Sequence, residues 1–159
     1  MWPFTPKKAD PPVTIAVVDP HRLFREGISQ LLTHYNYQVK MTCADGKEFI
    51  TQLDSENLPD VLFIDVGETK ASKLHSTVKA IYPSVKIVVM AIEKRELEGL
   101  EKEEAIQAHI SKTADPSAFK MAVKAVMKGK AFYERDVDLV LYEEPDPLMI
   151  ERMRNQGWY

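Results

Sequence analysis

The sequence has very little cysteine and no long apolar run, and each shortage excludes a class of protein. A single cysteine, Cys43, cannot form an internal disulfide, which excludes a small secreted scaffold held together by disulfides. The longest apolar stretches, such as residues 87–92, are far shorter than the ~20 residues that cross a bilayer. The first residues also lack the apolar core of a secretory signal. We therefore expect a cytoplasmic protein that does not bind a membrane.

An excess of positive charge is missing as well. The chain carries 21 basic and 24 acidic residues, a formal net charge of -3, so it has no overall positive field to attract nucleic acid. Its 159 residues are 45% hydrophobic and 28% charged, which is a globular composition. This length predicts one compact domain and is too short for two full ones.

The chain divides into three parts. Residues 1–12 hold four of the ten prolines and are expected to form an N-terminal arm, with Trp2 and Phe4 as apolar side chains. Residues 13–133 carry the regular pattern of a folded domain. Residues 134–159 form a C-terminal tail that is too short for a second domain and is expected to hold a short strand and a helical turn. Its aromatic end, Trp158 and Tyr159, is a candidate anchor for a partner.

Short apolar runs rich in β-branched residues mark the strands. Residues 14–18, 61–64 and 87–92 are almost continuously apolar, as expected for strands buried on both faces of a parallel sheet. The more polar run 38–43 is typical of an edge strand, and residues 108–111 predict a short fifth strand.

Helical patterns lie between these runs. The apolar spacing predicts helices over residues 21–35, around 49–53, over 74–81 and, after Asp115, to Gly129, while the charged segment 93–104 predicts a short or loosely packed helix. Strand and helix thus alternate five times. We expect an α/β fold with a doubly wound five-stranded parallel sheet in the flavodoxin-like order 2-1-3-4-5, covered by helices on both faces.

Polar residues follow the ends of the predicted central strands. In open α/β sheets, ligands bind beyond the carboxyl ends of the strands. Asp19, Asp65 and Lys112 occupy such positions, and Ala91 ends the fourth strand. Two acids and a lysine that meet there could bind a metal ion or a phosphoryl group.

Three segments resemble the receiver domains of bacterial two-component response regulators of the LuxR/NarL subclass. These are Asp-Pro-His-Arg-Leu-Phe-Arg-Glu-Gly at 19–27, Pro-Asp-Val-Leu-Phe-Ile-Asp at 59–65 and Ala-His-Ile-Ser-Lys at 108–112. The likeness covers about residues 13–133. It implies that Asp65 accepts a phosphoryl group from a histidine kinase and that Lys112 pairs with Asp65 and then with the phosphoryl group. It also implies that Asp19, Asp65 and the backbone carbonyl of Gly67 hold Mg²⁺.

The sequence departs from the family pattern at several of these places. Pro20 stands where the second acidic ligand is expected, and Ala91 replaces the hydroxyl residue that grips the phosphoryl group. His109 stands at the position of an aromatic switch residue, where we expect it to be partly exposed. The Met-Pro turn that usually follows the phosphoacceptor is also absent. We therefore expect weak Mg²⁺ binding and weak or absent phosphorylation at Asp65.

Several functions remain open on the sequence. The preferred one is an atypical receiver that is no enzyme and acts by contact with a protein: a histidine kinase, another regulator or a second copy. A conventional receiver switched by phosphorylation at Asp65 is the main alternative. Residues 134–159 cannot contain a helix-turn-helix, so we expect no nucleic-acid binding by this chain.

Two enzymatic or cofactor functions have weaker support. A haloacid-dehalogenase-like phosphohydrolase needs an acid two residues after Asp65, where Gly67 stands. Flavin binding needs a phosphate loop that Pro20 and its neighbours do not supply. The other histidines, His21, His34 and His75, show no metal-ligand spacing, and Cys43 is expected to be a small buried residue.

Overall fold

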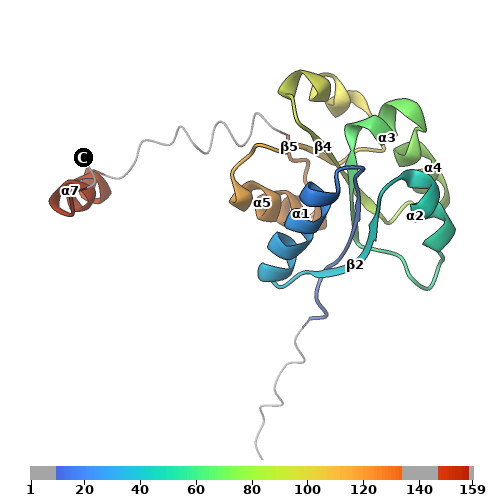
Figure 1. Ribbon diagram of the computed structural model, residues 1–159, viewed down its shortest axis with the longest axis horizontal. Coiled ribbons are helices and arrows are strands. Elements are labelled where there is room, and N and C mark those ends of the chain that lie inside the picture. The colour runs from blue at the N-terminus through green and yellow to red at the C-terminus, as the bar shows by residue number, and fades with distance from the viewer. Residues whose placement is uncertain (1–9, 134–146, 158–159) are drawn as a thin grey trace, which may run out of the picture.

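A five-stranded parallel sheet in the order β2-β1-β3-β4-β5 forms the centre of the protein, as expected. This computed structural model describes residues 10–133 and 147–157 (Figure 1). The strands are β1 (Thr14–Val18), β2 (Gln38–Cys43), β3 (Val61–Asp65), β4 (Lys86–Ala91) and β5 (Ala108–Ser111). Strands β1, β3 and β4 are buried almost throughout, which is why their sequences are nearly continuous apolar runs.

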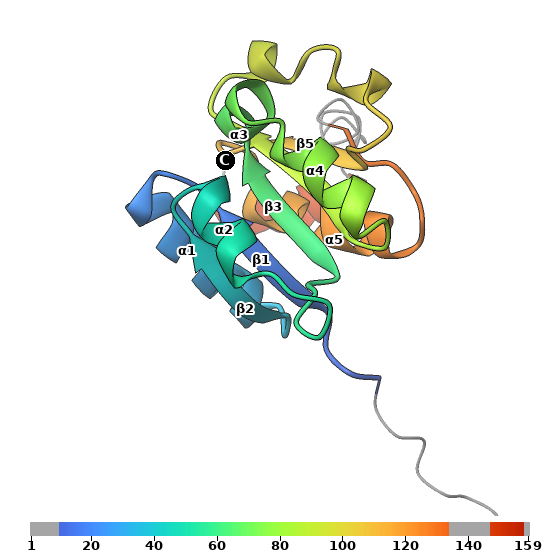
Figure 2. The same cartoon turned by 90° about the vertical axis from the view of Figure 1, so that its right-hand side faces the viewer.

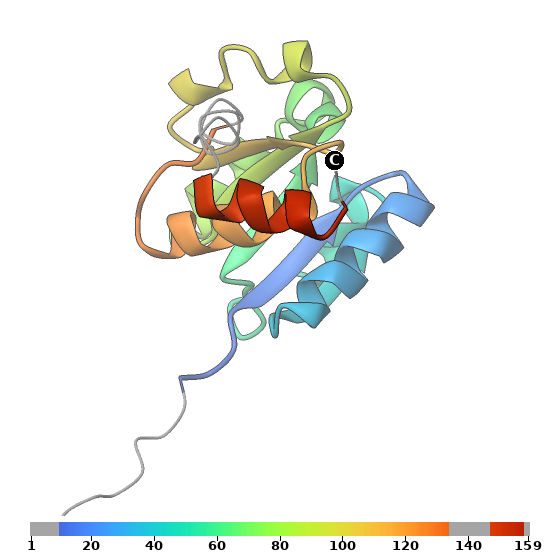
Figure 3. The ribbon, with the colours of Figure 1, turned by 90° about the vertical axis from the view of Figure 1, so that its left-hand side faces the viewer.

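Helices cover both faces of the sheet. They are α1 (Arg22–His34), α2 (Gly46–Gln52), α3 (Val66–Ala71), α4 (Leu74–Ile81), the 3-10 turns η1 (Lys94–Leu97) and η2 (Leu100–Lys102) and α5 (Pro116–Met127). A last helix, α7 (Pro147–Asn155), contributes no described side chain to the two core clusters on the sheet. The apolar sides of α2 and α4 pack on one face together with Leu97 and Ile106, on the side that Figure 2 presents. Helices α1 and α5 pack on the opposite face, in blue and orange in Figure 3.

Helix α1 has a narrower apolar side than its sequence predicts. Ile28 and Leu32 are buried, and Phe24 and Leu31 pack against the same core. Leu23, whose spacing from Leu31 predicts a place on this face, is 85% exposed. It lies in the first turn, beyond the carboxyl end of the sheet, where the strands no longer cover it.

Two helical segments differ from expectation. The charged segment 93–104 forms two 3-10 turns in place of one helix, because Leu97 is its one fully buried apolar anchor and Leu100 is only partly covered. Helix α3, which the sequence did not predict, begins directly after β3. It is separated from α4 by Lys73, whose backbone is left-handed with φ 50°.

Residues 131–133 extend the sheet beyond β5. The backbone N–H of His109 donates to the carbonyl of Phe132 at 3.0 Å, and Phe132 N–H donates to Gln107 at 3.3 Å. Phe132 is buried in the core below. At the opposite edge, a bulge in β2 sets Lys40 between Val39, which pairs with Ile15, and Met41, which pairs with Ala16.

The strand and the helical turn that we expected in residues 134–159 lie only partly within the described residues. Helix α7 includes the segment 148–153, whereas residues 137–141, expected to form a strand, and the anchors Trp158 and Tyr159 lie outside them. Most of the proline-rich arm, with Trp2 and Phe4, lies outside them too. Across residues 10–133 and 147–157, no helix combines the length and the apolar character needed to span a membrane.

Candidate functional site

Asp19, Asp65 and Lys112 meet at the carboxyl end of the sheet. Each follows or ends a strand, Asp19 after β1, Asp65 at the end of β3 and Lys112 after β5. The ammonium nitrogen Nζ of Lys112 lies 2.6 Å from Oδ2 of Asp19 and 2.7 Å from Oδ1 of Asp65. The site therefore consists of two carboxylates bridged by one internal cation.

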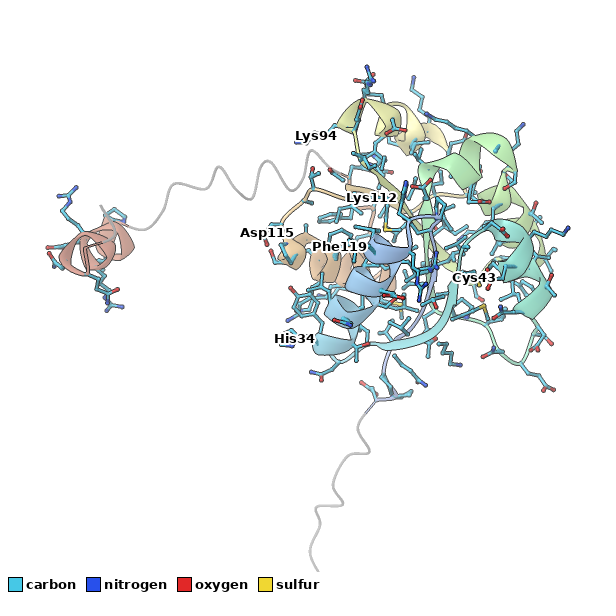
Figure 4. All side chains as sticks on the ribbon, in the orientation of Figure 1. His34, Cys43, Lys94, Lys112, Asp115 and Phe119 are labelled. Atoms are coloured by element: carbon cyan, nitrogen blue, oxygen red, sulfur yellow. The ribbon has the colours of Figure 1, made fainter. Side chains whose placement is uncertain are left out.

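The backbone fixes these side chains from below. Asp19 N–H donates to the Cys43 carbonyl at 3.0 Å, and Lys112 N–H donates to the Ala91 carbonyl at 2.7 Å. The Lys112 side chain lies beside α1, with Nζ 4.8 Å from the centre of the Phe24 ring. Figure 4 labels Lys112, together with Phe119 of α5. The cation thus gains an aromatic face in addition to its two carboxylates.

Burial is deepest at Asp19. Its side chain is fully buried and that of Lys112 is 5% exposed, whereas 13% of the Asp65 side chain reaches solvent. Oδ2 of Asp19 contacts Nζ but has no partner with hydrogen-bond geometry. Because a buried carboxylate needs a counter-charge, the Lys112 ammonium is a structural requirement of the site as well as a chemical group in it.

His21 also belongs to the site, although we saw no metal-ligand spacing for it in the sequence. It precedes α1 as its N-cap, and its backbone N–H donates to Oδ1 of Asp19 at 2.7 Å. Its ring nitrogen Nδ1 lies 3.1 Å from the same oxygen and 3.2 Å from Nζ of Lys112. The signal in the sequence is the Asp-x-His spacing, since a turn two residues long can fold a side chain back onto the preceding carboxylate.

Asp65 is held by the helix that follows it. It is the N-cap of α3, and its Oδ2 accepts the backbone N–H of Gly67 at 2.9 Å. A side chain at position 67 would bring its Cβ to 2.9 Å from this oxygen, so glycine permits the contact. The resemblance led us to expect the Gly67 carbonyl at a metal. Gly67 lies in the first turn of α3 with its amide bonded to Asp65, and the role of its carbonyl at a metal stays a prediction.

The two substituted positions contribute no polar side chain. Pro20 is exposed and has neither donor nor acceptor there, and Ala91 is fully buried at the end of β4. Ser111 pairs with Ala91 across the two strands, but its hydroxyl is hydrogen-bonded to Oγ1 of Thr113 at 2.7 Å. The site therefore has a lysine and two acids but lacks a second neighbouring acid and a hydroxyl at position 91.

His109 is the second residue of β5 and is more buried than we expected, with 7% of the residue exposed. Its ring packs against Tyr133, with 4.9 Å between ring centres and an angle of 31° between planes. The added segment 131–133 supplies this cover, which the sequence did not reveal. Residue 109 is thus part of the packed interior.

A cation could be held by Asp19, His21 and Asp65, which each offer a ligand atom within 4.8 Å of the others. The fold family implies Mg²⁺ at this edge. Mg²⁺ prefers an octahedron of oxygen atoms. Here one of three donors is an imidazole nitrogen, and Pro20 offers no oxygen from its side chain. The residues present fit Mg²⁺ poorly.

Similar proteins agree with this architecture. Residues 15–124 match the response regulator receiver domain family. The transcriptional regulatory protein DegU of Brevibacillus brevis is 28% identical over 144 residues, covering 83% of this chain and 57% of that protein. This chain therefore spans little more than half the length of that relative.

Solved structures share the fold. The isolated receiver domain of RcsB from Salmonella enterica serovar Typhimurium, with phosphomimetic BeF3-, has a TM-score of 0.68 at 22% identity, covering 80% of this chain and 97% of that chain. A LuxR-family two-component response regulator from an Aurantimonas species also has a TM-score of 0.68, at 21% identity, covering 81% and 94%. With the sheet order, the meeting of Asp19, Asp65 and Lys112 and the matched family, this chain belongs to the response regulator receiver domain family.

Proposed function

We propose that this protein is an atypical receiver domain of two-component signal transduction, which acts mainly through protein contact and is phosphorylated weakly or not at all at Asp65. The observation that carries the proposal is the closed ion triad. The Lys112 ammonium contacts both carboxylates, while Pro20 and Ala91 supply neither the second acid nor the hydroxyl. Phosphoryl transfer depends on positioning and on neutralising negative charge, and both are reduced here.

Phosphorylation at Asp65 would need a bound divalent cation, and this site is poorly suited to bind Mg²⁺. A phosphoryl group brings further negative charge to two carboxylates that share one ammonium. Without a well-held divalent cation, little offsets that repulsion. Binding of Mg²⁺ is therefore expected to be weak.

A conventional receiver, phosphorylated at Asp65 by a histidine kinase, is the second candidate. It is favoured by the 2.7 Å contact between Lys112 and Asp65 and by the partial exposure of the Asp65 carboxylate. A haloacid-dehalogenase-like phosphohydrolase has no such support, because Gly67 offers no acid and its amide is bound to Asp65. Members of this receiver family are signalling modules, not enzymes.

Intact mass separates the first two candidates. The full chain is incubated with Mg²⁺ and a small phosphodonor, with Asp65→Asn as the control. We expect no stoichiometric addition of a phosphoryl group to the wild-type chain. A stoichiometric addition that Asp65→Asn abolishes would favour the conventional receiver and refute the proposal.

A gain-of-function pair tests the cause. Pro20→Asp restores an acid beside Asp19 and is expected to raise Mg²⁺ affinity in calorimetry, whereas Pro83→Asp, at an exposed turn far along the chain, adds the same charge without effect. Equal affinities for the two variants would show that the absent acid is not what weakens the metal site.

The partner we favour is a second copy of this chain. Helices α1 and α5 enclose an apolar groove of about 430 Å³ beside Lys112, formed mainly by Leu23, Phe24, Leu31, Pro116 and Phe119. Leu23 is 85% exposed at its rim, a costly position for so large an apolar side chain. One solved relative, RcsB, is described as two dimers bound to two parallel DNAs, with a TM-score of 0.69 to this chain at 22% identity.

Sedimentation over a range of concentrations tests this partner. Leu23→Asp is expected to shift self-association to higher concentration. Ile81→Asp, which alters an apolar residue on α4 that is 59% exposed, should leave self-association unchanged. A wild-type chain that stays monomeric, or equal effects of both substitutions, would leave a kinase or another regulator as the partner.

A further inference from the structure

The Lys112 ammonium lies among three potential metal ligands. Nζ is 2.6 Å from Oδ2 of Asp19, 2.7 Å from Oδ1 of Asp65 and 3.2 Å from Nδ1 of His21. A cation bound by these three atoms would occupy the same place. We call these three atoms and the space between them the cage. In this structure the Lys112 ammonium occupies it.

His21 is oriented toward this cage by the start of α1. Its backbone is extended, with φ -85° and ψ 100°, and both its backbone N–H and its ring nitrogen Nδ1 contact Oδ1 of Asp19. The side chain is 55% exposed, so the ring can shift without disturbing the core. The position of Nδ1 is therefore built in, while the small adjustment needed to close around an ion costs little packing.

Asp19 contributes the most deeply buried oxygen of the cage. Its Oδ2 is completely buried, faces the cage and has no partner with hydrogen-bond geometry, although Nζ is in contact with it. The ion pair with Lys112 therefore holds this oxygen by charge, and a cation in the place of the ammonium would meet the same oxygen.

The donor set selects the kind of ion. Zinc accepts both imidazole nitrogen and carboxylate oxygen, and catalytic zinc sites use three protein ligands and leave a position for water. Mg²⁺ favours oxygen donors in an octahedron. We propose that Asp19, His21 and Asp65 bind Zn²⁺ or another divalent transition ion that accepts imidazole, and that this ion displaces the Lys112 ammonium. The inference rests on the proposed function, in which the pocket has departed from Mg²⁺-dependent phosphorylation.

Replacing a singly charged ammonium with a divalent ion changes the charge of the pocket. Two carboxylates with one ammonium leave one net negative charge, whereas two carboxylates with one divalent ion are neutral. The released Lys112 side chain must then find another position, next to Phe24 and the groove between α1 and α5. Metal occupancy would thereby alter the same surface that we propose for self-association.

Calorimetry on the full chain, without a histidine tag and freed of metal, tests the site. Zn²⁺ and Mg²⁺ are titrated into the wild type, into His21→Ala and into His34→Ala, a matched control at the exposed last turn of α1. We expect one Zn²⁺ per wild-type and His34→Ala chain, bound at least tenfold more tightly than Mg²⁺. His21→Ala should weaken Zn²⁺ binding by about tenfold or more, since even an outer-shell partner contributes that much.

Co²⁺ provides a spectroscopic second measurement. Its visible absorption responds to nitrogen coordination, so the wild-type and His34→Ala spectra should agree and the His21→Ala spectrum should differ. Equal Zn²⁺ affinity of the two histidine variants, or Mg²⁺ binding as tight as Zn²⁺ binding, would overturn the proposal. These results are independent of the phosphodonor experiment: a phosphorylated Asp65 refutes the proposed function, whereas loss of the His21 dependence refutes only the metal site.

Discussion

Nζ of Lys112 and Oδ2 of Asp19 lie 2.6 Å apart, and together the two side chains are almost completely withdrawn from solvent. The pair joins the end of β5 to the end of β1 across β3 and β4, which lie between them in the sheet. Removal of one member of a buried ion pair leaves the other charge without compensation, which costs more than the pair itself contributes.

Lys112→Met is therefore expected to lower the free energy of unfolding by about 3–5 kcal/mol, because Asp19 would remain charged and buried without its partner. Urea denaturation followed by circular dichroism measures the loss. Lys124→Met, on the exposed side of α5, serves as the control and should change little. Equal stabilities of the two variants would mean that solvent or another cation already compensates Asp19.

Glycine 67 and glycine 27 should respond in opposite ways to alanine. In Gly67→Ala the new Cβ would lie 2.9 Å from Oδ2 of Asp65 and push the N-cap contact apart, at a cost of about 1 kcal/mol. In Gly27→Ala, in the middle of α1 with no atom within 4 Å, alanine should stabilise the helix by up to about 1 kcal/mol. Thermal melts of both variants test the contrast, and a neutral Gly67→Ala would argue against a tight contact at Asp65.

His75 makes stability depend on pH. Burial lowers its pKa below the usual 6.5, with Lys73 acting in the same direction and Glu103 opposing it. Below pH 6.5 the unfolded chain therefore binds the proton more readily than the folded one, and the free energy of unfolding falls as the solution is acidified through this range. At higher pH the effect vanishes, since both states are neutral.

Replacing His75 tests its contribution to the pH dependence of stability. His75→Gln should flatten the acid limb of the stability curve, whereas His34→Gln, at an exposed position, should leave its shape unchanged. Denaturant titrations at several pH values below neutrality provide the comparison. Parallel curves for wild type and His75→Gln would show that other groups cause the acid sensitivity.

Cys43 should be unreactive in the folded protein. Burial, followed by the nearby carboxylates of Glu48 and Asp45, raises the pKa of its thiol to about 11, and 1% of the residue is exposed. Because the thiolate is the reactive form, alkylation by iodoacetamide at mildly alkaline pH should be slow until urea unfolds the chain. A Thr42→Cys variant, whose added thiol is exposed, should be labelled once at the rate of a free cysteine.

The sequence was most informative where burial on both faces dictates residue type. Val17, Phe63 and Val88 lie in short, continuous apolar runs. Such runs are typical of strands buried on both faces of a parallel sheet, so the strands and their parallel order could be predicted. Parallel strands also place their carboxyl ends together, and for this reason the meeting of Asp19, Asp65 and Lys112 was predictable.

Local backbone geometry was less accessible. The participation of His21 depends on the dihedral angles at the start of α1, which no periodicity encodes. Helix α3 has only Val66 and Thr69 buried, too few residues for an amphipathic pattern. The contact of Tyr133 with His109 depends on a three-residue extension of the sheet, and a segment of three residues is too short to show a strand pattern in the sequence.

The two edges of the sheet are protected against pairing with a strand of another chain. Along β5, the paired residues 131–133 occupy backbone groups that an unrelated strand could otherwise use. Along β2, the bulge at Lys40 and its charge interrupt the regular ladder that strand addition requires. Neither margin invites another chain to continue the sheet, so association of folded copies should proceed through side chains of the helices and not through amyloid-like growth.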